Sequence, residues 1–140
     1  MENKLDKIEM AGKDLIRYYC PDYTFIWDRS VRRKGQCRRR ARQIGISKPL
    51  AELNTFESML LTVIHEIAHA LTGGGHGQEW RRVCLDLGGD GRTYYDANNT
   101  VIPSPKWVLW IDGKPSSIKR VRKVALYNPH YEWKALEEVK

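Results

Sequence analysis

The sequence predicts a small α+β domain in which helices pack against a small sheet. Residues 3–19 carry apolar side chains at helical spacing, and residues 55–71 carry a longer apolar face. Between them, residues 23–28 are rich in aromatic and β-branched side chains, as strands are, and residues 37–46 are a second candidate strand despite their arginines. Because 140 residues suit one core, we expect a single domain over residues 1–140.

The first helix is expected to bury one side. Its apolar stripe consists of Leu5, Ile8, Leu15, Ile16 and Tyr19. Gly12 lies on the same side, where close packing could need it, and residues 20–22 end the helix. The two candidate strands, separated by a turn at Gly35, would then pair as a hairpin.

The second helix has recognisable ends. Residues 49–53 are expected to be a connection, and Asn54 with Glu57 three residues later has the pattern of an N-cap and capping box. The helix would run from Thr55 to Leu71 and stop at residues 72–75, because glycine accepts the positive φ of a helix C-terminus.

This helix is expected to have two different faces. Six apolar residues fall within an arc of about 100°: Phe56, Leu60, Val63, Ile64, Ile67 and Leu71. His65 and His69 lie on the opposite side, with Glu66 at its edge. The helix would therefore bury one face in the core and turn the other toward a cleft.

His65 and His69 are four residues apart, so they lie about 40° apart around the helix and can reach one metal ion. With Glu66 between them they form the His-Glu-x-x-His arrangement of zinc metalloproteases. A catalytic zinc takes three protein ligands and keeps one open position. His76 follows a glycine run that can fold the chain back, which makes it the natural third ligand; Glu79 is the alternative.

Residues 78–87 are expected to form a third helix with Trp80 on its buried stripe. Residues 90–105 are turn-rich and predict a surface loop. Tyr94 and Tyr95 in this loop, together with several arginines, are candidates to stabilise an oxyanion, and the sequence does not choose among them.

The C-terminal part predicts a hairpin. Residues 106–111 have the composition of a strand, residues 112–115 that of a turn, and residues 118–126 that of a basic strand or short helix. Residues 133–140 could form one helical turn. His130 stands alone, and we expect it not to be a metal ligand.

The net charge of +7 is unevenly distributed. Seven cations lie close together: Arg32, Arg33, Lys34, Arg38, Arg39, Arg40 and Arg42. Lys119, Arg120, Arg122 and Lys123 form a second cluster. Such patches suit nonspecific binding of nucleic acid, although a solvated basic face or an acidic protein substrate also explains them. Trp27 or Trp110 could stack on the bases of single-stranded DNA, but both also fit core positions.

The composition also suggests a compartment. No apolar run approaches the roughly 20 residues of a membrane span, and the N-terminus has no signal-peptide pattern. Cys20, Cys37 and Cys84 are scattered, which disfavours a disulfide framework and suggests the reducing cytoplasm. We expect each to be a small buried hydrophobic residue.

The motif resembles that of the SprT-like metalloprotease family, which includes Spartan and its microbial and phage relatives. The family pattern is His-Glu-x-x-His, a short turn, and His-Gly-x-x-aromatic, matched by His65, Glu66, His69, His76, Gly77 and Trp80. The resemblance implies a zincin-like fold, a zinc held by three histidines, and Glu66 as the catalytic base. A metzincin is excluded, because Thr72 occupies its glycine position and its third histidine would come one residue earlier.

Several relatives bind DNA and digest proteins crosslinked to it. Many cellular members carry a zinc ribbon, but this chain has no Cys-x-x-Cys. The sequence thus predicts a zinc endopeptidase that acts on DNA-associated proteins. The alternatives are a zinc peptidase for free cytoplasmic proteins and a non-catalytic DNA-binding protein with a structural zinc. A structural site normally has four protein ligands, and Glu66 would then have no evident role, which favours catalysis.

Overall fold

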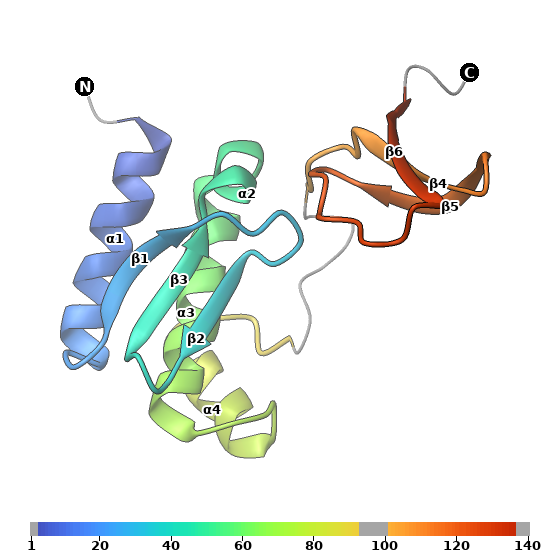
Figure 1. Cartoon of the computed structure of the whole chain (residues 1–140). Coiled ribbons are helices and arrows are strands. Elements are labelled where there is room, and N and C mark those ends of the chain that lie inside the picture. The colour runs from blue at the N-terminus through green and yellow to red at the C-terminus, as the bar shows by residue number, and fades with distance from the viewer. Residues whose placement is uncertain (1–2, 93–100, 137–140) are drawn as a thin grey trace. The chain divides into compact units, whose positions relative to one another are not determined.

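The computed structural model describes residues 3–92 and 101–136 (Figure 1). Contacts within the chain divide it into a first unit, Met1–Ile102, and a second unit, Pro103–Lys140. Helices and small sheets together confirm the predicted α+β class. The zincin-like fold and the single domain over residues 1–140 stay predictions. Within the described ranges, no helix has the length and apolar character needed to cross a membrane.

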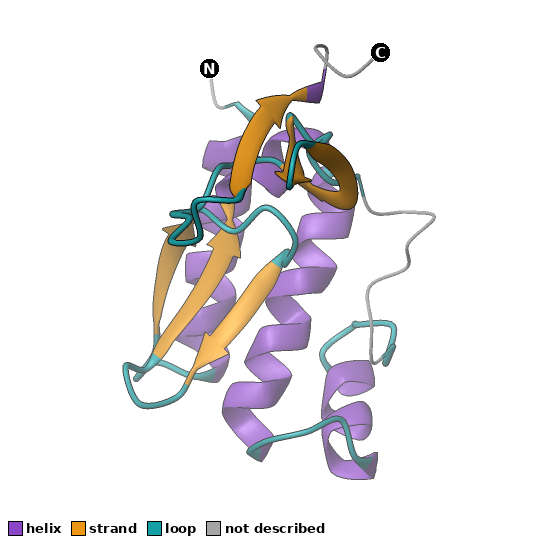
Figure 2. Cartoon of the chain, turned by 45° about the vertical axis from the view of Figure 1, so that its right-hand side comes forward, coloured by secondary structure: helices purple, strands orange, loops and turns teal. Residues whose placement is uncertain are grey.

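The first unit places its helices on one face of a three-stranded sheet. Its elements are α1 (Lys4–Tyr19), β1 (Thr24–Asp28), β2 (Gly35–Arg38), β3 (Gln43–Ser47), α2 (Lys48–Leu53), α3 (Phe56–Thr72) and α4 (Gln78–Asp86). The strand order is β1-β3-β2, which leaves β2 at an edge. Helices α1 and α3 lie side by side against the sheet, and α4 packs on α3 (Figure 2). The core fills the layer between sheet and helices.

The expected hairpin between residues 23–28 and 37–46 is wrong. β1 instead pairs with β3 in parallel, with Phe25 opposite Ile44, and the antiparallel hairpin is formed by β2 and β3. The predicted second strand is therefore two strands joined by a tight turn, in which Arg42 takes a φ of 52°. Gly35, expected in a turn, begins β2. The sequence pattern showed no break between β2 and β3, because both strands are short and arginines continue through the turn that joins them.

Helix α1 fits its prediction. Ile8, Gly12 and Ile16 are its buried residues. A Cβ added to Gly12 would come within 2.8 Å of the Phe25 ring, so this glycine allows α1 to approach β1 closely. Close packing at Gly12 is thus confirmed.

Two details around α2 correct the sequence analysis. Residues 49–53 belong to a helix and not to a plain connection, and the Ser47 hydroxyl accepts from the backbone N–H of Leu50 to cap it. Helix α3 is capped by Thr55 and not by Asn54. The buried Asn54 side chain instead bonds both backbone groups of Val101, each at 2.7 Å. The Asn54 side chain bonds a residue distant in sequence instead of capping the helix next to it. Hydrophobic periodicity cannot reveal such a long-range hydrogen bond.

Helix α3 is more deeply buried than the two-faced prediction implies. Val63 and Ile67 are fully buried, as expected, but Leu71 is 44% exposed. His65 and Glu66, predicted to face a cleft, are only 8% and 5% exposed. The cleft side of the helix is therefore covered by other elements.

The second unit is a three-stranded antiparallel sheet of order β5-β4-β6, with β4 (Trp107–Ile111), β5 (Lys114–Arg120) and β6 (Tyr131–Ala135). The β4–β5 hairpin and its turn at Asp112 and Gly113 are confirmed, but the second strand runs from Lys114 to Arg120 and not over residues 118–126. Of the helical turn expected over residues 133–140, residues 133–135 lie instead in β6, with Trp133 opposite Leu109, whereas Leu136 has a 3₁₀-helical conformation. The last part of this expected turn, residues 137–140, lies outside the described residues.

Candidate metal centre

Two adjoining segments bring three histidines together. His65 and His69 occupy successive turns of α3, and His76 lies in the loop before α4. Gly73 ends α3 with a φ of 101°, and Gly75 has a φ of 80°; other residues rarely adopt these conformations. The glycines therefore allow the tight reversal that returns His76 to the helix.

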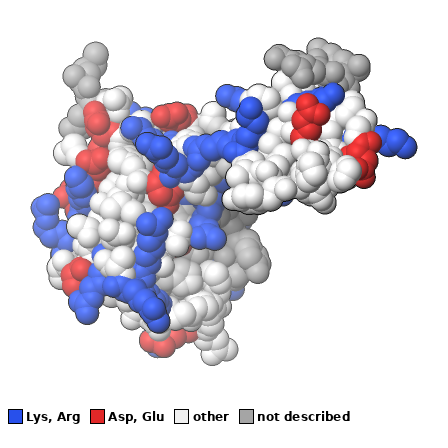
Figure 3. Space-filling view, in the orientation of Figure 1, with Lys and Arg blue, Asp and Glu red and all other residues white. Residues whose placement is uncertain are grey.

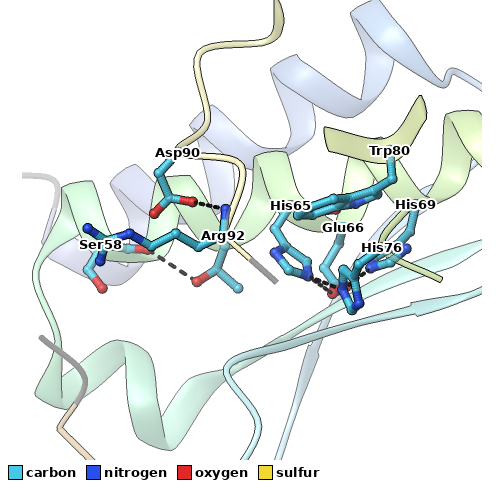
Figure 4. Close-up of polar contacts among 9 residues, drawn as sticks. Ser58, His65, Glu66, His69, His76, Trp80, Asp90 and Arg92 are labelled. Carbon is cyan, nitrogen blue, oxygen red and sulfur yellow. Dashed lines mark hydrogen bonds and ion pairs between the residues drawn. The ribbon is translucent and has the colours of Figure 1, made fainter. Parts of the chain in front are cut away.

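The imidazole rings converge on one point (Figure 4). Nε2 of His76 lies 2.9 Å from Nε2 of His69 and 3.2 Å from Nε2 of His65. Three nitrogens bound tetrahedrally to zinc at 2.0–2.1 Å would be about 3.3 Å apart, so these two distances are near those expected in a zinc site. Within residues 3–92 and 101–136, these three form the one cluster of potential metal ligands, with donor atoms all within 4.8 Å of one another. Glu79, the alternative third ligand, is exposed and not part of it.

Trp80 of α4 supports all three rings from one side (Figure 4). Its indole stacks on His69 with ring centroids 5.4 Å apart, and it meets His65 and His76 edge-on, each at 4.7 Å. The indole N–H donates to the backbone carbonyl of His65 at 3.3 Å. At 2% exposure Trp80 is the core anchor that the sequence predicts. Its contact with every histidine could not be predicted from its place on a buried stripe.

Glu66 lies beside the imidazole cluster. Its Oε1 is 3.9 Å from Nε2 of His65, and its buried Oε2 has no hydrogen-bond partner among the described residues. Burial raises the pKa of Glu66 to about 7, against an opposing effect of the Arg33 charge. A carboxyl group with a pKa near neutrality can both accept and return a proton. Leaving a buried carboxylate oxygen without a hydrogen-bond partner costs folding free energy, and such groups are typical of functional sites.

The histidines are suited to bind a cation. Burial lowers the pKa of both His65 and His69 to about 4, and the charges of neighbouring histidines act in the same direction. Both imidazoles are therefore neutral at pH 7, and metal binding requires the neutral form.

A cleft of about 370 Å³ opens onto this cluster. It is lined by Arg33, Gly35, Gln36, Cys37, Arg39, His65, Glu66, His69, Gly74 and His76. Strand β2 therefore forms the wall opposite α3. A Cβ on Gly35 would lie 2.7 Å from Thr62 and 3.1 Å from Glu66, so glycine allows the strand to approach the helix. The zincin-like fold that the motif resemblance implies predicts a sheet edge beside the metal cleft, but the residues alone did not indicate which strand forms it.

The cysteines divide between core and cleft. Cys20 and Cys84 are buried, as expected, and all three thiols are free. Cys37 is half-buried and lines the cleft, so the expectation of a buried residue is only partly met for it. Burial, and next the Glu66 charge, raise the pKa of its thiol.

The basic segment divides into exposed arginines and one buried lysine. Arg32, Arg33, Arg38, Arg39, Arg40 and Arg42 are exposed, and blue side chains spread over the sheet side of the first unit (Figure 3). Lys34 is only 4% exposed and donates to the Ser58 hydroxyl at 2.6 Å. Its burial, which also lowers its pKa, removes it from the predicted nucleic-acid surface.

The remaining candidate residues are not part of the cluster or lie outside the described ranges. His130, expected not to be a ligand, places its Nδ1 3.1 Å from a carboxylate oxygen of Asp112 in the second unit. Tyr94 and Tyr95, the candidate oxyanion residues, lie outside the described residues.

A helix with two histidines beside a glutamate, and a loop that adds a third histidine, define a protein with a candidate metal centre in an α+β unit. The chain belongs to the SprT-like family, whose model matches residues 6–101. This match confirms the resemblance found in the motif and ends before the second unit. The family is associated with metalloprotease-like proteins. No curated protein matches the chain.

Proposed function

We propose that this protein is a zinc-dependent endopeptidase. The observation that carries the proposal is the convergence of three imidazole nitrogens, with the Glu66 carboxyl group 3.9 Å from one of them. His65, His69 and His76 would hold the ion and leave one position open for catalysis. Zinc bound there would supply Lewis-acid polarisation of the scissile carbonyl and a more acidic water.

Glu66 performs the proton transfers in this proposal. Its carboxylate accepts a proton from the attacking water and returns it to the leaving amine. The raised pKa suits both steps, because the group is neither a very weak base nor a very weak acid near pH 7. A purely structural zinc is the weaker alternative, since it would leave a buried carboxyl group beside the ion without a function.

The substrate would bind along β2. This strand is an edge of the sheet and also a wall of the cleft. An extended peptide can add to such an edge through main-chain hydrogen bonds, which accept many sequences. This arrangement suits an endopeptidase that cuts exposed or unfolded segments.

Removal and return of zinc test the proposed activity. The purified protein should cleave casein, lose the activity when a chelator removes the metal, and recover it with a stoichiometric amount of Zn²⁺. Mg²⁺ should not restore it, because Mg²⁺ prefers oxygen ligands. Cleavage that continues at full rate in metal-free protein would contradict the proposal.

We further propose that exposed arginines direct the peptidase to nucleic acid and to the proteins on it. Arg32, Arg38 and Arg40 are exposed and do not line the cleft. Arginine suits phosphate because its planar group donates two parallel hydrogen bonds. Binding should be nonspecific, and a cytoplasmic location remains part of the proposal.

Changing Arg32, Arg38 and Arg40 together to Glu should abolish this binding. Fluorescence anisotropy with single- and double-stranded oligonucleotides across a salt series measures it. For wild type, the log–log slope on single strands should be about −0.7 per phosphate contacted. A matched control changes Lys7, Lys13 and Arg17 of α1 to Glu, which alters the net charge of the protein by the same amount as the first triple variant. If both triple variants bind like wild type, the peptidase acts on free proteins instead.

A further inference from the structure

Strand β2 and the residues just beyond its ends line the metal cleft. Gly35 faces Thr62 and Glu66 of α3. Cys37, two residues on, lines the cleft near enough for the Glu66 charge to act on its thiol. Gln36 also lines the cleft, as do Arg33 before the strand and Arg39 after it.

Each of these two arginines interacts with a residue of the metal-binding helix, Arg33 through its charge and Arg39 through a hydrogen bond. The positive charge of Arg33 acts on the Glu66 carboxyl group. The Arg39 guanidinium donates to the backbone carbonyl of His69, near the C-terminal end of α3. A guanidinium has five N–H donors, so this bond leaves Arg39 able to bind a ligand as well. Arg33 thus lies at the Glu66 end of the cleft and Arg39 at the His69 end.

The cleft is strongly biased in charge. Its described lining contains two arginines and a single carboxyl group, that of Glu66, which the proposed chemistry uses. A peptide that adds to the β2 edge advances about 3.3 Å per residue and points alternate side chains to the same face. Its side chains on either side of the scissile bond would therefore meet the two guanidinium groups.

We propose that Arg33 and Arg39 make the cleft select peptide segments with carboxylate side chains on both sides of the scissile bond. This inference rests on the proposed peptidase function and names its substrate class. It also assigns two roles within the basic segment. Arg33 and Arg39 in the cleft recognise the peptide. Arg32, Arg38 and Arg40 lie outside the cleft and would bind nucleic-acid phosphates.

Cleavage of matched peptides tests the selectivity. Three fluorogenic peptides of equal length carry Glu, Gln or Lys at the flanking positions. Wild type should show kcat/KM about 5- to 20-fold higher for the Glu peptide than for the Lys peptide, since one exposed ion pair typically contributes a factor of up to about 5. Arg33→Gln should remove the preference on one side of the scissile bond and Arg39→Gln on the other. Arg33→Glu should favour Lys on its side.

Controls separate recognition from damage to the metal centre. Arg17→Gln on α1, far along the chain from the cleft residues, should keep the wild-type ratio. Arg39→Lys should keep most of the preference, because it keeps the charge. Each variant is compared at equal zinc content, since Arg39 also contacts the carbonyl of a metal-binding residue.

A binding assay decides the inference without catalysis. The Glu66→Gln variant should bind the Glu peptide more tightly than the Lys peptide by a similar factor, and adding Arg33→Gln and Arg39→Gln should remove the difference. Peptides cleaved without regard to charge would overturn the inference and leave the proposed peptidase intact. No cleavage together with selective binding would overturn only the peptidase. If an oligonucleotide displaces the Glu peptide and loses affinity in the two Gln variants, these arginines bind phosphate, and the inference fails.

Discussion

Replacing Glu66 with Gln should lower the rate of peptide-bond cleavage by about 10²–10⁴-fold, the usual contribution of a general base. Gln has the same shape but cannot accept a proton at neutral pH. It should not unfold the protein, because Glu66 is 5% exposed and a neutral amide is easier to bury than a carboxylate. The zinc content should be unchanged, since Glu66 is not one of the three converging ligands.

The measurement compares cleavage of a fluorogenic peptide by wild type and the variant at equal zinc loading. Glu79→Gln is the matched control, because Glu79 is exposed on α4 and outside the cluster. It should cleave at the wild-type rate. Full activity in Glu66→Gln would show that another group accepts the proton. Loss of activity in the control would indicate that Glu79 takes part in the metal site.

The second large effect is the loss of zinc when a converging histidine is removed. His65→Ala, His69→Ala and His76→Ala should each weaken zinc binding by more than the 10- to 100-fold that is typical when only a hydrogen-bond partner of a ligand is lost. Two remaining imidazoles cannot supply the three protein ligands of a catalytic zinc site. Competition with a chromophoric chelator, followed by elemental analysis, measures the affinity.

His76 is the most informative of the three positions. It is exposed and lies outside α3, so its replacement should not disturb the core. Zinc retained in His76→Ala but lost in Glu79→Ala would reverse the assignment of the third ligand. His130→Ala, in the second unit, serves as the histidine control and should keep wild-type affinity.

The sequence predicted the local parts of this site because they depend on short-range spacing. His65 and His69 are brought together by one turn of helix, and the glycines after Leu71 mark both the end of α3 and the reversal to His76. The helix itself could be predicted because its apolar periodicity persists over 17 residues. Short elements gave weaker signals: the six residues of α2 are too few to show a period.

The resemblance implies a sheet edge beside the cleft, but the strand that forms this wall could not be predicted from the residues, because it depends on which strands pair. Parallel pairing of β1 with β3 places β2 at the edge beside α3, and nothing in a single sequence specifies that partner. Gly35 was expected in a turn, yet its lack of a side chain is what allows β2 to pack close to Glu66. The division of the arginines between cleft and outer surface follows from the same pairing.

The coordination of the bound metal tests the central claim most directly. X-ray absorption at the zinc K edge of the purified protein should show three imidazole nitrogens and one water oxygen, at about 2.0–2.1 Å, as a catalytic site requires. A sulfur ligand at about 2.3 Å, or four protein ligands with no water, would contradict the account and indicate a structural zinc.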